Sequence, residues 1–589
     1  MRPSHRKIPV VLLLSLSAAL AMPRAGSTQA EWTEADTRRI VDNVSELRLD
    51  PDLSHLGAGE RTVVANLLEA GKIFQELYED QNHPDAIWAR ARVRPDSDEA
   101  ILYRLYQGPV GTNGSNQRAP FLAVRPERPG RNVYPLDLMA GGLDAYISAH
   151  PAERAELLDV RTVVRRATEA NLLADRATLE ANPWLKVLHA DFAARVEALE
   201  DGPADDVFYA APYAVAYAGR LLRVRQLLTE AADAVAQEDR DLAAYLRLRA
   251  DDVLTSNYEA GDAAWVSGRF ADLNAQIGSY ETYDDALYGV KAFFSLSLLA
   301  RDRARSDELA AALTDIQAIE NALPYSRPKT VRSQIPVGVY NVVADFGQAR
   351  GTNTATILPN DADHARKYGR TILLRYNIMT APELFEGARS RFCAAVAESH
   401  CDELSMAGNF QRTLWHEIGH YLGVDRTGDG RALEDALGTV SNLYEEMKAD
   451  LVSLFSADRL HDGGHYGDRE LRELYAGGIL RVLQAGQPRR DQPYQTMQLM
   501  QWNWYLAREL LTLENGRLRI HYDRYPDAVE SLLREVLAVQ ASGDPARADA
   551  FIDEWTAWDP ELHGVVASAI RGAAGGGRVW LVRYGALGE

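Results

Sequence analysis

The segment TLWHEIGHYLGV, residues 413–424, contains two histidines whose spacing could hold a metal ion. His416 and His420 are four residues apart, so both imidazoles lie on one face if the segment is helical. Glu417 follows the first histidine, and a carboxylate in that position can take a proton from metal-bound water. The motif is short, and in a chain with 13 histidines it also arises by chance. Taken alone, it leaves two packed imidazoles as an open alternative.

A second segment offers the third ligand that a zinc site needs. In NLYEEMKADLVSLF, residues 442–455, an apolar helical stripe consists of Leu443, Met447, Leu451 and Leu454. Glu446 and Asp450 are four apart beside this stripe, where a carboxylate without a partner is costly. A metal ion would pair with Glu446, and Asp450 could accept the free ring N–H of a ligating histidine. The two segments together favour a metal site over two solvated helices, and the ligand types favour zinc among divalent metals.

Helices are expected over most of the chain from Glu31 to about Phe270, where they would serve as packing elements. Residues 33–49 are an example, with Thr33 as the expected N-cap. Their apolar stripe consists of Ile40, Val41, Val44 and Leu47. Residues 108–137 are rich in Gly, Asn and Pro and predict a loop with at most one strand.

Strand composition dominates in the middle of the chain. Within residues 335–379, IPVGVYNVVADFG and RTILLRYNIM are enriched in β-branched and aromatic residues and predict a small sheet. Helices are expected again from about Ala381 to Ser542, the region that contains both candidate metal-binding segments. Near the C-terminus, RVWLVRY predicts one last strand.

The N-terminus indicates export. Residues 1–30 combine a basic start, an apolar core from Ile8 to about Leu20 and small residues after it, which is typical of a cleaved signal. A single membrane anchor is the alternative, although the apolar run is shorter than the ~20 residues that a span needs. No later segment is long and apolar enough to cross a bilayer. In an oxidising compartment the two cysteines, Cys393 and Cys401, favour a disulfide over free thiols.

Composition restricts the classes of partner. The chain has 64 Lys and Arg against 84 Asp and Glu, a formal net charge of -20, which disfavours nonspecific binding to nucleic acid or anionic lipid. Its 46% apolar content excludes wholesale disorder. A length of 589 residues predicts two or three domains, or one large two-lobed enzyme.

Two further segments join the metal-binding pair in a recognisable order. These are IGSYETYDDALYGVKAFF, residues 277–294, and ILPNDADHARKYGRTILL, residues 357–374. Together the four segments resemble the dipeptidyl peptidase III family of zinc metallopeptidases, in an exported bacterial form: its ETY segment, its asparagine-rich substrate-binding strand and turn, and its paired zinc motifs. The resemblance covers roughly residues 270–510.

The resemblance implies a role for each matched residue. It implies one zinc ion per chain, bound by His416, His420 and Glu446, with Glu417 as general base and Asp450 beside a ligating histidine. It also implies Tyr283 as a hydrogen-bond donor to the scissile carbonyl oxygen. Glu281 and Asn360 would hold the free N-terminus and the backbone of the substrate.

Three departures from the family pattern concern the site. The zinc motif has five residues here instead of six, a spacing that a straight helix accepts. Ile357 stands where the family commonly has a second asparagine, which removes one substrate contact. Tyr494 falls near the place of a histidine usually found downstream. The last two departures concern substrate binding and dipeptide release, not the hydrolysis itself.

The resemblance implies a mixed, predominantly α fold with a small β-sheet or barrel region, and two lobes with a cleft between them. The expected organisation is a signal peptide (1–30), a substrate-binding lobe (31–380), a helical zinc-binding lobe (381–555) and a C-terminal return to the first lobe (556–589). The zinc ion would belong to the helical lobe.

The expected reaction is removal of dipeptides from the free N-terminus of short peptides, in the periplasm or outside the cell. The partners would be short peptides, with no nucleic acid and no stable membrane association after signal cleavage. One alternative is a noncatalytic peptide- or metal-binding protein that keeps the fold, although such a protein would not need Glu417. A second alternative is a zinc hydrolase of other amides or longer peptides.

Overall fold

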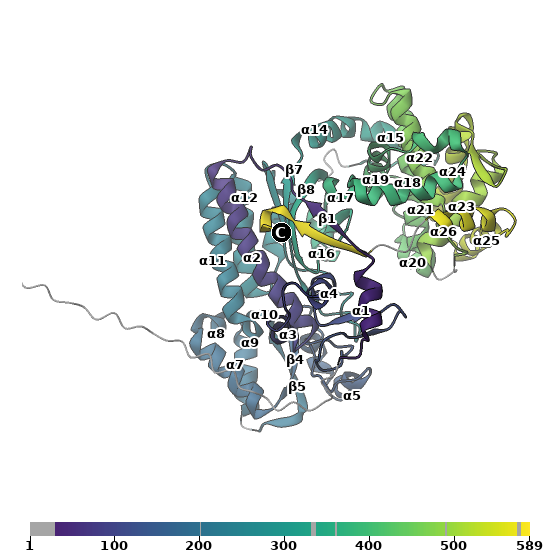
Figure 1. Ribbon diagram of the computed structural model, residues 1–589. Helices are drawn as coiled ribbons and strands as arrows, with labels where there is room; N and C mark the ends of the chain where they lie inside the picture. The colour runs from purple at the N-terminus through teal and green to yellow at the C-terminus, as the bar shows by residue number, and fades with distance from the viewer. Residues whose placement is uncertain (1–29, 201, 332–336, 360–361, 489–491, 574–578) are drawn as a thin grey trace, which may run out of the picture.

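The protein folds into two lobes (Figure 1). The structure is a computed structural model, and it describes residues 30–200, 202–331, 337–359, 362–488, 492–573 and 579–589. The first lobe combines long helices with a mid-chain sheet, and the second, green to yellow in Figure 1, is built mainly of helices. The mixed, predominantly α, two-lobed fold expected from the sequence is confirmed.

A five-stranded mixed sheet forms the centre of the first lobe. Its strands, in spatial order, are β6 (Leu273–Ser279), β7 (Phe294–Arg301), β8 (Val337–Gly347), β10 (Thr371–Arg375) and β9 (Ala355–Leu358). β8 and β10 run parallel, and the other neighbouring pairs are antiparallel. The two mid-chain segments predicted as strands contain β8 and β10. Within the described residues the sheet stays open, so the barrel is not formed.

Long helices cover this sheet. Helix α2 (Ala58–Asn82) packs against β7 and β8, and α11 (Ala218–Val235) contacts both α2 and α12 (Arg240–Thr255). A Cβ atom at Gly71 of α2 would lie only 2.2 Å from the ring of Phe346 on β8. Glycine is therefore what permits the close approach of this helix to the sheet.

The helical lobe is organised around α21 (Ser441–Asp462). This helix contacts α19 (Met406–Gly419), α22 (Asp468–Val482), α23 (Pro493–Ala507) and α24 (Tyr525–Ser542). The four apolar stripe residues predicted on it from the sequence are all buried. Because packed helices surround α21, its acidic residues beside the stripe are held in fixed surroundings.

The C-terminal end of the chain belongs to the first lobe. Strand β13 (Val579–Tyr584) pairs in parallel with β1 (Val44–Leu49) over six residue pairs. The guanidinium of Arg104, in the first lobe, donates to the carboxylate of Glu589 at 2.6 Å. The last strand predicted from the sequence is therefore present, and it joins the two ends of the chain.

The helix predicted over residues 33–49 is too long. Thr33 caps α1 (Glu34–Val41) as predicted, with a reciprocal capping box, but the helix ends there. Val44 and Leu47 instead belong to β1. Their spacing of three favours a helix, because in a strand the two side chains point to opposite faces. The partner strand that overrides this preference, β13, lies at the far end of the sequence.

Two antiparallel strand pairs were not predicted from the sequence. Residues 108–137 contain two short strands, β2 (Val110–Thr112) and β3 (Arg118–Pro120), where at most one was expected. In the region expected to be mostly helical, β4 (Thr162–Ala167) pairs with β5 (Ala204–Pro212). The strands of this second pair are separated by helices, so no short turn signal predicts their pairing from the sequence.

Cys393, on α18 (Pro382–Ala395), is bonded to Cys401, which confirms the disulfide favoured from the sequence. This link lies immediately before α19. None of the helices in the described part of the chain combines the length and apolar character of a membrane span. The expected signal, residues 1–30, lies outside the described residues except for Ala30.

Candidate metal centre

Helix α19 carries one histidine and ends at the other. The hydroxyl of Ser405 caps the helix by accepting a hydrogen bond from the backbone N–H of Gly408 at 2.9 Å. The helix runs to Gly419, and His420 is its C-cap. His416 is buried, His420 is half-buried, and their ring centroids are 4.9 Å apart. One helical turn therefore presents both imidazoles on the same side.

Helix α21 approaches this turn closely because a glycine faces it. A Cβ atom at Gly419 would lie 2.8 Å from the carbonyl oxygen of Ala449 on α21. The buried ammonium of Lys448 donates to the carbonyl oxygens of Gly419 at 3.0 Å and Leu422 at 2.8 Å. Both carbonyls lie at or just beyond the C-terminal end of α19. The contacts fix the position of the histidine-bearing turn against α21.

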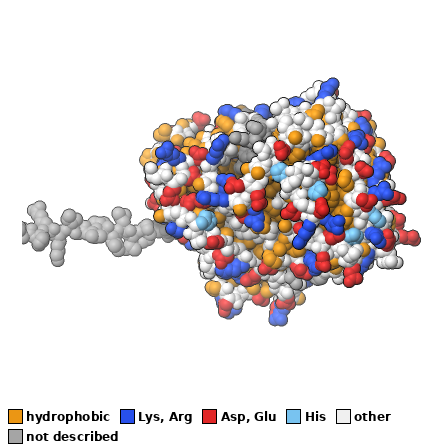
Figure 2. Space-filling view, turned by 90° about the horizontal axis from the view of Figure 1, so that it is seen from above, with side chains coloured by type: hydrophobic (Ala, Val, Ile, Leu, Met, Phe, Trp, Pro, Cys, Tyr) orange, Lys and Arg blue, Asp and Glu red, His pale blue; other side chains and the backbone are white. Residues whose placement is uncertain are grey.

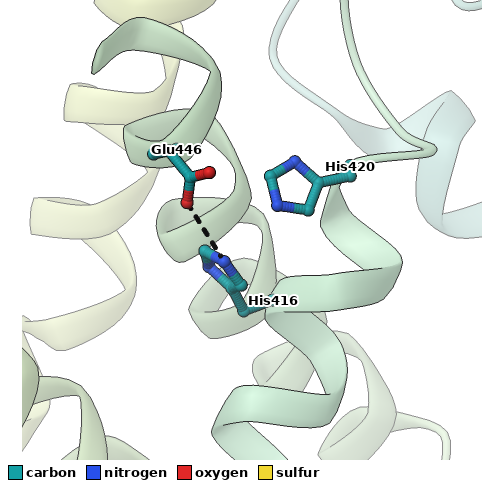
Figure 3. A group of neighbouring side chains, drawn as sticks. All are labelled: His416, His420 and Glu446. Atoms are coloured by element: carbon teal, nitrogen blue, oxygen red, sulfur yellow. Dashed lines mark ion pairs between the residues drawn. The ribbon is translucent and has the colours of Figure 1, made fainter. Parts of the chain in front are cut away.

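His416, His420 and Glu446 converge between the two helices (Figure 3). One potential ligand atom of each residue lies within 4.8 Å of those of the other two. Nε2 of His416 and Oε2 of Glu446 are 3.4 Å apart. Two imidazoles and one carboxylate are a donor set typical of catalytic zinc sites, which keep a further position open. The three residues could therefore hold one metal ion on the helical lobe.

Asp450 holds the first histidine. Its Oδ1 lies 2.8 Å from Nδ1 of His416, and its carboxylate also pairs with Arg412 and Arg481, each at 3.2 Å. Burial alone would raise the pKa of Asp450, but Arg481, His416 and Arg412 hold it well below its usual range. An ionised Asp450 favours a ring proton on Nδ1, so that Nε2 could face a metal ion bound between the two helices.

The second histidine is held by an acid that the sequence analysis did not single out. Oε1 of Glu445 lies 3.0 Å from Nδ1 of His420 and 2.7 Å from the ammonium of Lys448. Burial opposes ionisation, but Lys448 and His420 lower the pKa of Glu445 to about 2. The available signal was the EE doublet with a lysine three residues after its first acid, a spacing that pairs charges on a helix.

Glu417 lies next to the cluster with its carboxylate unengaged. The residue is half-buried on α19, directly after His416. Across the described part of the chain, no hydrogen bond or ion pair engages its carboxylate. A partly buried carboxylate without a partner beside a metal position is suited to accept a proton from water.

Tyr494, on α23, reaches the cluster from a third helix. Its hydroxyl donates to Oε1 of Glu446 at 3.2 Å, and its side chain is 47% exposed. The resemblance places a histidine near this position in the family. In this protein a phenol therefore contacts the candidate carboxylate ligand instead.

Glu281 and Tyr283 lie elsewhere, in a pocket on the sheet of the first lobe. The pocket has a volume of about 140 Å³ and is also lined by Asn353, Ile357 and Arg375. Glu281 is half-buried, and Tyr283 is 66% exposed. Among the described residues, no hydrogen bond or ion pair connects Glu281 or Tyr283 to the metal cluster. The predicted residues therefore form two groups, one on each lobe.

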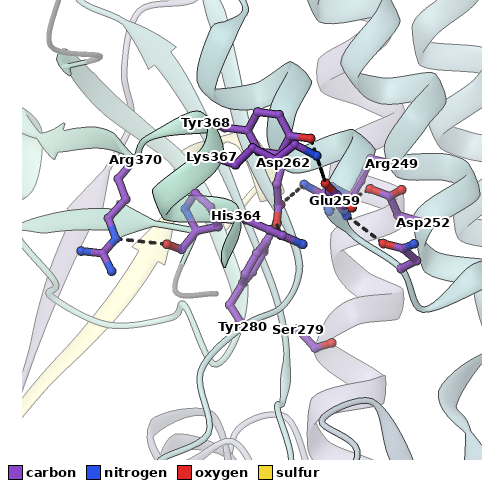
Figure 4. Close-up of polar contacts among 12 residues, drawn as sticks. Arg249, Asp252, Glu259, Asp262, Ser279, Tyr280, His364, Lys367, Tyr368 and Arg370 are labelled. Carbon is purple, nitrogen blue, oxygen red and sulfur yellow. Dashed lines mark hydrogen bonds and ion pairs between the residues drawn. The ribbon is translucent and has the colours of Figure 1, made fainter. Parts of the chain in front are cut away.

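Asn360, the remaining predicted substrate residue, lies outside the described residues. Helix α16 (Ala362–Tyr368), which follows it, is tied to a buried charge network (Figure 4). Nδ1 of His364 lies 2.9 Å from Oδ2 of Asp262, whose other oxygen pairs with the fully buried Arg249 at 2.8 Å. This network anchors α16 to the helices beside the sheet, and the sequence analysis did not foresee it.

Comparison with known proteins identifies the fold. No family model matches the chain. The dipeptidyl peptidase III structure from Caldithrix abyssi superimposes with a TM-score of 0.77 at 22% identity, covering 93% of this chain and 98% of that one. The dipeptidyl-peptidase III structure from Corallococcus sp. strain EGB superimposes with a TM-score of 0.68 at 23% identity, covering 94% of this chain and 97% of that one. The chain is also 24% identical over 566 residues to Nudix hydrolase 3 of Arabidopsis thaliana, covering 88% of this chain and 70% of that protein. The fold is thus that of the dipeptidyl peptidase III structures.

Replacing Glu446 with alanine is expected to remove the metal. Wild type should contain about one zinc per chain, and the variant should lose it because two imidazoles alone leave the ion short of its protein ligands. Metal analysis of the purified proteins measures this. The matched control is Glu434→Ala, an exposed glutamate on α20 (Leu433–Leu437), which should keep wild-type zinc. Full zinc in Glu446→Ala would remove this residue from the ligand set.

Proposed function

We propose that the protein is a zinc metallopeptidase of the dipeptidyl peptidase III family that removes dipeptides from the free N-terminus of short peptides. The observation that carries the proposal is the convergence of two histidines and Glu446 beside the unengaged carboxylate of Glu417. The fold shared with two dipeptidyl peptidase III structures supports the substrate class. The word hydrolase in the name of the Arabidopsis relative agrees with a reaction that consumes water.

The residues of the helical lobe would divide the work of hydrolysis. Zinc, when bound, supplies a Lewis acid for a carbonyl group and for water. Glu417 takes the proton from the attacking water and passes it to the leaving amine. Asp450 and Glu445 hold the Nδ1 atoms of the two histidines, so that the other ring nitrogens face the metal position.

The residues of the first lobe would hold the peptide. The ammonium group at the N-terminus of the substrate pairs with Glu281, and Asn360 holds the backbone. The hydroxyl of Tyr283 donates to the scissile carbonyl oxygen, where negative charge develops. Because these residues and the metal cluster belong to different lobes, we expect the lobes to close around the substrate before the reaction.

We further propose that the enzyme acts in the periplasm or outside the cell. The export signal expected in residues 1–30 supports this location. The disulfide between Cys393 and Cys401 agrees with an oxidising compartment. The net charge of -20 disfavours nucleic acid as a partner.

Blocking the substrate N-terminus tests the proposed anchoring. N-acetylation of a tetrapeptide is expected to lower kcat/KM by about a hundredfold, on the order of 3 kcal/mol, because it removes the cation that pairs with Glu281 and leaves that carboxylate unpaired in its pocket. The measurement compares kcat/KM for the free and acetylated peptides. Equal cleavage of both would leave an endopeptidase or another amidase.

A variant identifies the residue responsible. Glu281→Gln should slow cleavage of the free peptide much more than cleavage of the acetylated one. Glu230→Gln, an exposed substitution on α11, is the matched control and should leave the ratio between the two peptides unchanged. A ratio in Glu281→Gln equal to that of wild type would assign the recognition of the ammonium group to another residue.

A further inference from the structure

A second pocket in the helical lobe is lined by three arginines. It lies between α18, α19, α22, α23 and α26 (His563–Ala573), and its volume is about 290 Å³. Its polar lining consists of Arg391, Asn409, Arg412, Arg481 and Gln498, and its other lining residues are apolar. We call it the arginine pocket. The proposed peptide hydrolysis touches it only through Asp450, with which Arg412 and Arg481 pair.

The lining of the arginine pocket is positively charged. Arg412 and Arg481 share the single carboxylate of Asp450. Arg391 is exposed and, among the residues that the structure describes, has no ion pair. The described lining contains no carboxylate. The chain as a whole has a net charge of -20, and acidic and basic side chains are interspersed on the face shown in Figure 2. A pocket with three guanidinium groups is therefore a local exception.

Arg412 provides an unused donor at this pocket. Its side chain is 9% exposed, its Nη1 pairs with Asp450, and its Nη2 donates to the hydroxyl of Thr413 at 2.8 Å. Its Nε is buried without a hydrogen-bond partner in the described residues. Burial lowers the pKa of Arg412 to about 10, opposed by Asp450 and reinforced by Arg481. A buried donor without a partner and a nearby like charge both favour an anion.

We propose that the arginine pocket binds a small oxyanion, a solute that carries a sulfate-like, phosphate or carboxylate group. Guanidinium groups match the geometry of such oxygens and form charge-assisted hydrogen bonds with them. The side-chain amides of Asn409 and Gln498 can donate to the same ligand. A metal cation is repelled by the arginines, and an apolar ligand would leave the buried donor unpaired. The proposal does not depend on peptidase activity.

Calorimetric titration of the zinc-loaded, full-length protein tests this. Sulfate represents a tetrahedral oxyanion and succinate a carboxylate, and sodium chloride keeps the ionic strength constant because exposed charges are screened by salt. We expect saturable binding of at least one probe, with one site per chain. The tighter of the two identifies the preferred group. Absence of saturable binding by both probes overturns the proposal.

A pair of variants on α18 locates the binding. Arg391→Ala removes the arginine that does not contact Asp450, and it should raise the Kd at least tenfold while zinc content and Tm stay at wild-type values. Arg389→Ala is the matched control, because Arg389 lies two residues away, pairs with Asp402 at 2.8 Å and does not line the pocket. It should keep the wild-type Kd. An unchanged Kd in Arg391→Ala, or an equal loss in both variants, would overturn the assignment.

Discussion

Replacing Glu417 with glutamine is expected to leave about one zinc per chain and to lower kcat by about 10²–10⁴-fold. Glutamine has nearly the same shape as glutamate, so the packing of α19 should be preserved. It cannot accept the proton of the attacking water at neutral pH. Glu417 makes no ion pair or hydrogen bond through its carboxylate within the described residues, so its loss should not release another charged group.

Metal analysis and kcat on a free tetrapeptide are the two measurements for this variant. Glu434→Gln, the same change at an exposed position of α20, should retain both zinc and turnover. A kcat for Glu417→Gln within about tenfold of wild type, about 1.4 kcal/mol of barrier, would contradict the role of general base. Loss of zinc together with turnover would show that Glu417 holds the ion.

Replacing Asp450 with alanine is expected to destabilise the protein by about 3–5 kcal/mol. Asp450 is 1% exposed and neutralises Arg412 and Arg481, so its removal leaves two guanidinium groups facing one another without the carboxylate between them. It also removes the group that holds Nδ1 of His416. Denaturant unfolding of the zinc-loaded protein gives the free energy of unfolding.

Two further variants separate the effect of losing the Asp450 charge from the effect of losing any acid on this helix. Asp462→Ala removes an exposed acid from the end of the same helix and should change stability by less than about 0.5 kcal/mol. Asp450→Asn keeps the shape, and among stable variants it should weaken zinc binding by about 10–100-fold because the hold on His416 changes. Wild-type stability and wild-type zinc affinity in Asp450→Ala would remove this residue from the metal centre.

The metal cluster was accessible to sequence reasoning because it depends on local spacing. His416 and His420 share a face through the helical period alone, and Glu446 stands beside an apolar stripe that the same period defines. Glu445 was missed because the spacing does not show which acid of the doublet faces the metal position and which contacts the ring nitrogen of a histidine on another helix. The close approach of α21 to Gly419 decides that, and it is a tertiary contact.

The rest of the site required the resemblance or the structure. Glu281 and Tyr283 follow a strand that the sequence analysis did not mark, and only the family pattern singled them out. Their pocket is lined by residues of strands that are far apart in the sequence. For example, β6 and β9 are the two edge strands of the same sheet. The arginine pocket gathers Arg391, Arg412 and Arg481 from three helices. Contacts between residues of different helices or strands produce no periodic pattern in the sequence, so they could not be predicted from it.

The pairing of β1 with β13 has a consequence for the order in which the two lobes can fold. The helical lobe lies between two segments of the first lobe, so it can fold from its own helices before β13 joins β1. The first lobe, although most of its sequence precedes the helical lobe, lacks one of its strands until residues 579–584 have joined it. During that interval β1 has an unpaired edge, which is the kind of surface that pairs with other chains. Pairing of β13 with β1 is therefore the step that completes the first lobe.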